Sequence, residues 1–130
     1  MYLGRMTILV EMLYQAKIGD GFKQKGLNRK NSFFKSPREA VSEALALKEK
    51  MDVRYKDEIK WEYNGKVTGT RNKMKFLKGY LGGDTESKPF YLQIVSVKQE
   101  DTISPVSPVM PKKITNKDKQ VMEKIVNLFN

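Results

Sequence analysis

The side chains that could do chemistry in this chain are lysine, arginine, aspartate, glutamate and tyrosine, because its 130 residues include neither histidine nor cysteine. The commonest general base, the thiolate nucleophile and the usual zinc ligands are therefore missing. Carboxylates can act in pairs as acid and base, but no spacing in the sequence brings two of them to working distance. The acids considered are Glu11, Asp52, Asp57, Glu58 and Glu62. We therefore predict a protein that is not an enzyme, with no catalytic residues, no metal ion and no cofactor.

Basic side chains are the second group of residues that could do chemistry. The chain has 25 lysines and arginines against 15 acids, which gives a formal net charge of +10. Two segments account for the whole excess. Residues 16–36 hold six cations and one acid, and residues 64–79 hold five cations and no acid, so each segment carries +5.

Both basic segments also contain glycine and amide or hydroxyl side chains, as loops that approach phosphates do. We expect these two loops to bind nucleic acid, DNA or RNA, by neutralising phosphates with little reading of bases. The expected contacts are Lys23, Lys25, Arg29, Lys30, Lys66, Arg71, Lys73 and Lys75. The alternative interpretation is a solvated surface that serves solubility. A common face for the two segments would favour nucleic acid. The aromatic residues among these cations are expected to pack in the core.

Several elements must position these segments. Thr7–Ile18 alternates between apolar and polar residues, which predicts a strand with one buried face. Ser36-Pro37-Arg38-Glu39 has a serine cap, a proline at the first helical position and a glutamate three residues after the cap. This pattern predicts a helix over Pro37–Met51 that begins with a capping box.

The middle of the chain predicts further strands. Ile59–Tyr63 alternates and leads into Asn64-Gly65, which predicts a type I′ hairpin with a returning strand over Lys66–Thr70. Apolar residues at helical spacing predict a short basic helix over Asn72–Leu81, with a strand as the alternative. Phe90–Val97 is apolar on both faces, as a central strand is.

The composition changes at Gln99, where three prolines without periodicity indicate a linker over residues 99–114. An amphipathic helix follows over Thr115–Asn130. Its apolar side needs a surface, which is the chain's own core, a second copy or another protein. The expected contacts are Val121, Met122, Ile125, Val126 and Phe129. The fold class is therefore α+β: a basic domain over residues 1–98, with a small antiparallel sheet of about four or five strands and one packed helix, then the linker and the C-terminal helix.

The run Ser32-Phe33-Phe34-Lys35-Ser36-Pro37-Arg38-Glu39-Ala40, which follows a strand and basic turns, resembles the arm-type DNA-binding domain of phage and transposon integrases. Phe34, Ser36, Glu39 and Ala40 match the Phe-x-Thr-x-x-Glu-Ala pattern with which that family opens its helix. The resemblance covers about 45 residues. It implies a sheet that docks on duplex DNA.

Two functions remain open. The leading prediction is a small, non-enzymatic nucleic-acid-binding protein. The alternative is a phage-like inhibitor or interaction protein of the kind that mobile elements encode, which binds a host protein or an anionic nucleotide ligand and assembles or self-associates through its C-terminal helix. The apolar run after Thr7 ends at Glu11, too early for a signal peptide or a membrane span, so we expect a cytoplasmic protein with no membrane partner.

Overall fold

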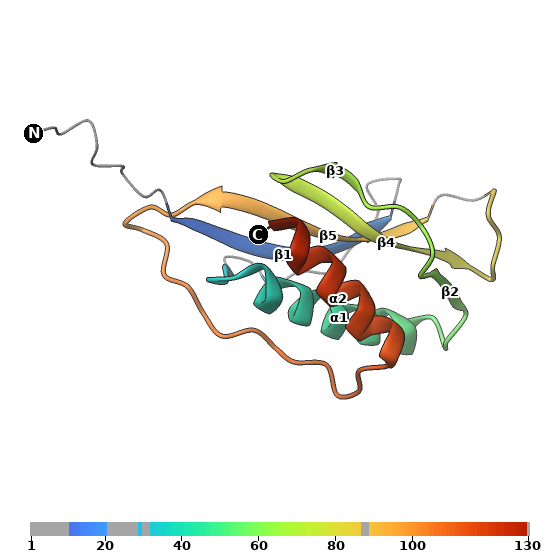
Figure 1. The fold of residues 1–130 in the computed structure, drawn as a ribbon. Coiled ribbons are helices and arrows are strands. Elements are labelled where there is room, and N and C mark those ends of the chain that lie inside the picture. The colour runs from blue at the N-terminus through green and yellow to red at the C-terminus, as the bar shows by residue number, and fades with distance from the viewer. Residues whose placement is uncertain (1–10, 21–28, 30–31, 87–88, 130) are drawn as a thin grey trace, which may run out of the picture.

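The fold is described by a computed structural model for residues 11–20, 29, 32–86 and 89–129 (Figure 1). Expectations that fall on residues 7–10 and on Lys23, Lys25 and Lys30 lie outside the described residues. The elements in chain order are β1 (Met12–Asp20), α1 (Pro37–Arg54), β2 (Ile59–Glu62), β3 (Thr68–Thr70), β4 (Lys73–Leu81), β5 (Phe90–Lys98) and α2 (Asn116–Phe129).

The strands form one antiparallel sheet with the order β1-β5-β4-β2, and β3 also pairs with β4. The five strands and two helices confirm the α+β class. The interior position of β5 also confirms the prediction from its apolar sequence, because a strand with neighbours on both sides is the most thoroughly buried.

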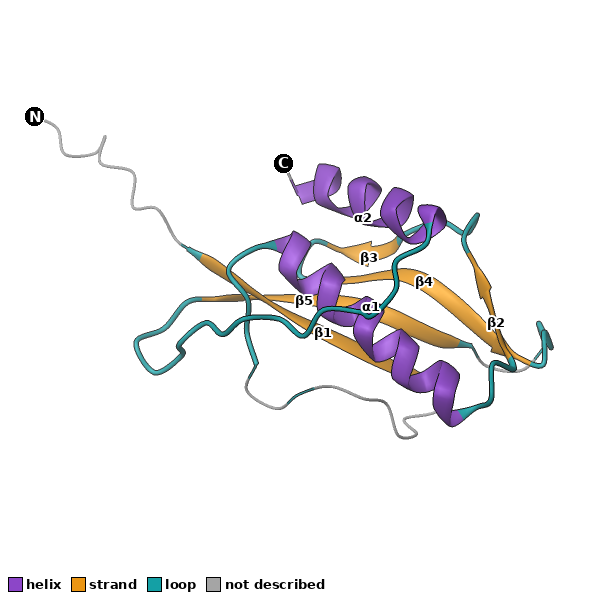
Figure 2. Cartoon of the chain, turned by 90° about the horizontal axis from the view of Figure 1, so that it is seen from below, coloured by secondary structure: helices purple, strands orange, loops and turns teal. Residues whose placement is uncertain are grey.

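Both helices lie on the same face of the sheet (Figures 1 and 2). Residues paired across antiparallel strands share a face, so the register identifies the strand residues beneath the helices. Ala16 and Met74 both lie opposite Ile94, and Ile18 lies opposite Leu92. All five are buried in one core cluster with residues of α1 and α2.

The helix α1 begins as the sequence predicts. Ser36 is its N-cap, with Oγ accepting a hydrogen bond from the Glu39 N–H at 3.2 Å, and Pro37 opens the first turn. The Ser36 hydroxyl donates to the Glu39 carboxylate at 3.0 Å, which differs from the expected contact of Glu39 with the backbone of Ser36. The helix continues past Met51 to Arg54.

The predicted helix over Asn72–Leu81 is wrong, because this segment forms the strand β4. The register of β4 against β5 shifts between Lys75 and Leu77, where a β-bulge adds a residue. The bulge changes which parity of residues faces the helices, so the buried Met74 and Leu77 stand three positions apart. This spacing resembles that of a helix, although the backbone is extended.

The predicted hairpin between Ile59–Tyr63 and Lys66–Thr70 is also wrong. The strands β2 and β3 do not pair with each other; β2 pairs with Lys78–Leu81 and β3 with Lys73–Lys75, one after the other along β4. Neither Asn64 nor Gly65 has the positive φ that a type I′ turn requires. The nine residues of β4 are enough to pair with β2 and then with β3. The segment that joins β2 to β3 therefore continues in the same direction along β4 and does not turn back.

The segment predicted as a linker runs along α1 on the side away from the sheet (Figure 1). Backbone hydrogen bonds hold it there. The Val106 N–H donates to the Phe33 carbonyl at 2.9 Å, and the Lys112 and Lys113 N–H groups donate to the Glu49 carboxylate at 2.8 and 2.9 Å. The proline-containing segment is therefore attached to the core.

The helix α2 is capped reciprocally: Thr115 Oγ1 accepts from the Asp118 N–H, and the Asp118 carboxylate accepts from the Thr115 N–H, both at 3.1 Å. Its apolar side packs on the chain's own core, the first of the three surfaces considered from the sequence. Val121, Met122 and Ile125 are buried there, and Val126 and Phe129 pack against the same cluster. No helix in the described part of the chain combines the length and apolar character that crossing a bilayer requires.

Candidate nucleic-acid interface

Arg29 is the one predicted contact of the first basic segment that belongs to the described residues, and it forms a structural ion pair. Its guanidinium donates to the Glu43 carboxylate through Nη2 at 2.7 Å and Nε at 3.1 Å, and to the Ser107 carbonyl at 3.0 Å. Glu43 is only 1% exposed and also accepts from the Val109 N–H at 2.8 Å. The hydrogen bond with Glu43 raises the pKa of Arg29 above its usual value. Arg29 therefore joins α1 to the segment 99–115.

The second basic segment lies at the opposite edge of the sheet from β1, along β3 and β4. Its four predicted contacts divide between the two faces of that edge. Lys73 and Lys75 alternate with the core residue Met74, which places them on the face away from the helices. Lys66 and Arg71 line a hollow beside α2 on the helix side. A ligand that crosses this edge would meet both pairs.

The sheet face turned away from the helices collects further cations. Cross-strand partners place Lys17, Gln93 and Lys75 in one row, Lys78 opposite Tyr91, and Lys60 opposite Tyr80. We call the following set the basic sheet face: Lys17, Lys60, Lys73, Lys75, Lys78, Tyr80 and Tyr91. The described strands place one acid on this side, Glu62, which lies opposite Lys78.

Two lysines of the basic sheet face lie beside an aromatic ring rather than a carboxylate. The Nζ atom of Lys75 lies 4.5 Å from the ring centroid of Tyr91, and that of Lys78 lies 5.9 Å from the same centroid. By contrast, each ion pair among the described residues includes a residue of Pro37–Arg54. The ammonium groups on the sheet therefore remain available to an external anion.

A polar atom at the centre of this face also lacks a partner. The Oε1 atom of Gln93 is buried and accepts no hydrogen bond from the part of the chain that the structure describes. In the register Gln93 lies between Lys17 and Lys75. A buried acceptor without a donor is uncommon in folded proteins.

Five members of the basic sheet face are not among the contacts predicted from the sequence: Lys17, Lys60, Lys78, Tyr80 and Tyr91. Lys17 and Lys78 lie within the two basic segments, but no sequence pattern distinguishes them from the other cations there. The signal was the alternation of Lys73, Met74, Lys75 and Phe76, which has the period of a strand. A strand there, paired with Phe90–Lys98, would have placed these lysines beside Tyr91.

Carboxylates on the helix side are engaged in structural contacts. Asp52 accepts a hydrogen bond from Trp61 Nε1 at 2.8 Å, and the buried Asp118 accepts one from the Tyr63 hydroxyl at 2.6 Å. Burial, together with this contact to Asp118, raises the pKa of Tyr63 above its usual value. Among the described residues no three acids lie close enough together to hold a metal ion.

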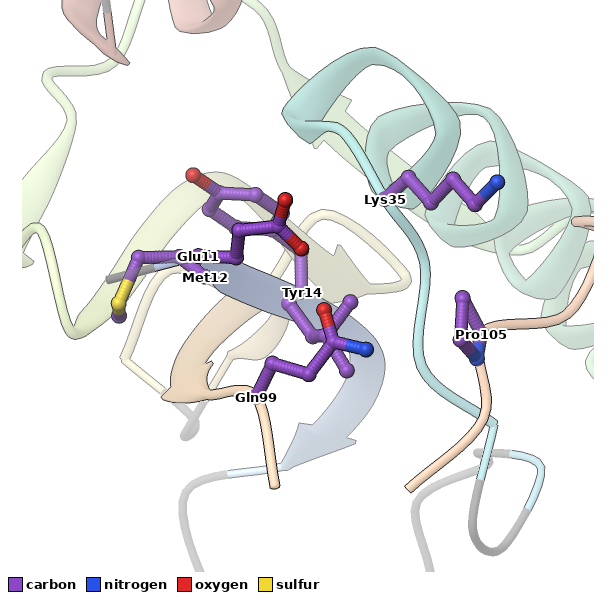
Figure 3. A pocket seen from close by; sticks show the side chains of 7 residues that line it. Glu11, Met12, Tyr14, Lys35, Gln99 and Pro105 are labelled. Carbon is purple, nitrogen blue, oxygen red and sulfur yellow. The ribbon is translucent and has the colours of Figure 1, made fainter. Parts of the chain in front are cut away.

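A hollow of about 740 Å³ lies between the start of β1 and the segment 99–115 (Figure 3). Its charged lining residues are Glu11 and Lys35, and Tyr14, Gln99 and Pro105 complete much of its wall. Figure 3 shows the Lys35 side chain pointing away from that of Glu11. The hollow therefore presents no paired acid and base.

An apolar surface lies on the outer side of α1. Val53 is 79% exposed and Met110 is 58% exposed, and both line a hollow of about 520 Å³ with Val109, Lys50 and Lys112. No residue of α2 lines this hollow.

In comparisons with protein-family models, curated proteins and solved structures, no match to this chain was found.

Proposed function

We propose that this chain is a non-enzymatic nucleic-acid-binding protein that holds phosphates on the basic sheet face and at the adjoining β3–β4 edge. The observation that carries the proposal is the segregation of charge. The sheet side without a helix bears five lysines and one acid, and its lysines have no carboxylate partner at ion-pair distance among the described residues. Such a surface attracts polyanions and gains affinity by releasing their counterions.

Single-stranded nucleic acid fits this surface better than a duplex. The major groove of a duplex admits a helix or a two-stranded ribbon, whereas the lysines here come from β1, β4 and β2 and so spread from one edge of the sheet to the other. Tyr80 and Tyr91 lie among the lysines and offer rings on which unpaired bases can stack. Phosphate contacts from lysine with stacking on tyrosine give binding with little sequence preference.

The test compares two variants with equal loss of charge. The first, Lys73→Gln/Lys75→Gln/Lys78→Gln, removes three cations of the basic sheet face. The second, Lys112→Gln/Lys113→Gln/Lys119→Gln, removes three exposed lysines from the helix side. The affinity for a labelled single strand of DNA, a single strand of RNA and a DNA duplex is measured by fluorescence anisotropy at two or more salt concentrations.

We expect the sheet variant to lose affinity for single strands and to lower the slope of log K against log salt by about one per contact removed. The control variant should keep most of the affinity, because its lysines lie away from the sheet face. Absence of binding by the unmodified chain at low salt, or equal losses in the two variants, would contradict the proposal. Tighter binding of the duplex would contradict the preference for single strands.

The predicted contacts of the first basic segment do not all belong to the proposed interface. Arg29 is engaged by Glu43, so we do not include it in the interface. Lys23, Lys25 and Lys30 lie outside the described residues, and their contribution stays a prediction. Replacing these three together by glutamine, in the same assay, measures it directly.

The second candidate function is that of an interaction protein, and the exposed apolar surface of Val53, Val109 and Met110 favours it. We propose a second copy of the chain as the occupant, because the exposed Val53, Val109 and Met110 line one hollow and two such surfaces can cover each other. Light scattering on the chain and on the Val53→Asp variant tests this: we expect an oligomer that the substitution dissociates. A monomer at high concentration would contradict it.

A further inference from the structure

A second hollow, of about 590 Å³, opens on the helix side of the β3 edge. One wall comes from the chain around β3 and the turn into β4, and the other comes from the last turns of α2. We call it the β3–α2 hollow. Its lining residues are Lys66, Val67, Gly69, Thr70, Arg71, Met74, Lys124 and Leu128. Its volume is within the range of small-molecule sites, about 300–1,000 Å³.

Three cations and no acid line this hollow. Lys66 and Arg71 belong to the second basic segment and Lys124 to α2, and within the described residues none of them forms an ion pair. The Arg71 guanidinium lies 5.7 Å from the ring centroid of Phe129, near the end of α2. Thr70 Oγ1 accepts a hydrogen bond from the Asn72 N–H, so its own proton remains free to donate. Convergent donors of this kind suit a phosphate.

The rest of the lining is apolar. Val67 and Met74 form one side, and Leu128, which is 47% exposed, lies on the other. Gly69 has a positive φ of 96°, and a Cβ atom there would collide with the Lys73 carbonyl oxygen. The β3 wall therefore carries no side chain at this position. The apolar lining beside the donors can contact the face of a base.

We propose that the β3–α2 hollow binds one nucleotide unit, with its phosphate at Lys66, Arg71 and Lys124 and its base against Val67, Met74 and Leu128. The site rests on the proposed function and deepens it: Lys66 and Arg71 belong to the β3–β4 edge of the proposed interface, and their hollow on the helix side takes one nucleotide instead of a strand. The nucleotide comes either from solution or from the phosphorylated end of a strand.

The first experiment measures binding of adenosine monophosphate, inorganic phosphate and adenosine to the full chain by isothermal titration calorimetry. We expect the monophosphate to bind at least about tenfold more tightly than either half alone, since each half uses one part of the hollow. The variant Lys66→Gln/Lys124→Gln should weaken the monophosphate by about tenfold or more. The matched control Lys112→Gln/Lys119→Gln, which removes the same charge elsewhere, should leave its affinity unchanged.

The second experiment distinguishes the two sources. A short deoxyadenosine oligonucleotide is compared with and without a 5′-phosphate, in the unmodified chain and in Lys66→Gln/Lys124→Gln. If the unmodified chain prefers the phosphorylated end and the variant does not, the proposal is supported with a strand end as ligand. If the unmodified chain binds free adenosine monophosphate, the proposal is supported with the free nucleotide as ligand. The proposal is overturned if neither is seen, if inorganic phosphate binds as tightly as the monophosphate, or if the control variant loses as much as the test variant.

The variant Lys73→Gln/Lys75→Gln/Lys78→Gln separates this site from the proposed function. It should lose affinity for unphosphorylated strands and keep its affinity for adenosine monophosphate. If the variant also loses its affinity for adenosine monophosphate, then the phosphate binds on the basic sheet face. That result would overturn the proposal of a separate site in the β3–α2 hollow.

Discussion

The helix layer and the basic sheet face use the same residue types in different ways. On the helix layer, three cations pair with acids: Arg29 with Glu43, Arg38 with Glu123, and Lys48 with Asp52. On the basic sheet face, Lys75 and Lys78 lie beside the ring of Tyr91 instead. A cation that an internal carboxylate already neutralises contributes to the fold, whereas one without such a partner can neutralise a ligand.

This difference explains why net charge alone locates a binding surface poorly. Arg29 counted fully toward the +5 of its segment, yet its charge is balanced by a buried glutamate that belongs to another part of the chain. The three lysines of β4 counted equally, and within the described residues no acid pairs with them. The distribution of acids in space, more than that of cations along the chain, therefore defines the candidate interface.

The largest effect should come from breaking the internal pair. Arg29→Ala removes the donors to Glu43, which is 1% exposed and keeps only the hydrogen bond from the Val109 N–H. We expect the free energy of unfolding to fall by about 3 kcal/mol, because a buried carboxylate is left without its counter-ion. Urea denaturation followed by circular dichroism measures it.

Two controls accompany this variant. Arg38→Ala breaks the pair with Glu123, in which both side chains are exposed. It should lower the free energy of unfolding far less than Arg29→Ala does. Arg29→Lys keeps the charge without the two-pronged contact and should be intermediate. If Arg29→Ala instead leaves stability unchanged and weakens binding of single strands, then Arg29 belongs with the ligand-binding cations and the comparison fails.

The next effect concerns Gly79, which lies on the helix side of β4, opposite to the side of its neighbour Lys78. Gly79 faces the helix layer, where a Cβ atom would lie 2.5 Å from Ile59 Cγ2 and 2.6 Å from the Trp61 ring. We expect Gly79→Ala to cost about 2 kcal/mol, because the Trp61 ring must move from its hydrogen bond with Asp52. Thermal unfolding measures the loss, and tryptophan fluorescence reports the displaced ring. An unchanged melting temperature would contradict the packing of β2 on β4.

The sequence predicted the elements that depend on local chemistry. The cap at Ser36 involves a residue three positions later, so its pattern is visible along the chain. The helix over Pro37–Met51 and the central strand over Phe90–Val97 are confirmed for the same reason. The apolar side of α2 was also predicted, although the sequence left open what covers it.

The elements that depend on partners far along the chain were not predicted. The bulge in β4 arises against β5, and it gives Met74 and Leu77 a spacing that imitates a helix. Asn64-Gly65 favours a tight hairpin locally, yet β2 and β3 both pair with β4. For the candidate site, Lys66, Arg71, Lys73 and Lys75 were named from composition, whereas Tyr91 joins them only through strand pairing. Tertiary pairing therefore overrode the local preference.

A smaller effect should appear as pH dependence on the helix layer. The pKa of Tyr63 is raised by burial and by the hydrogen bond to Asp118, so the folded state favours the neutral phenol. Its contribution to stability is complete below its unfolded-state pKa of about 10 and is lost as the pH rises above that value. Tyr63→Phe should cost about 1 kcal/mol at neutral pH and flatten the decline above pH of about 10. Urea denaturation from pH 7 to 11 on both proteins measures this; equal declines would show that Tyr63 does not cause it.

The smallest expected effect is on the other side of β4 from Gly79. Lys78 has its Nζ atom 5.9 Å from the ring centroid of Tyr91, so Lys78→Gln removes one cation with little loss of packing. Stability should stay within about 0.5 kcal/mol. Affinity for a single strand should fall a few-fold at low salt, and the salt slope should fall by about one. Because Lys78 and Gly79 are adjacent, the pair tests the comparison at a single place in the chain. A stability loss at Lys78 equal to that of Gly79→Ala, or a binding loss at Gly79 alone, would mean that the two faces do not divide folding from binding.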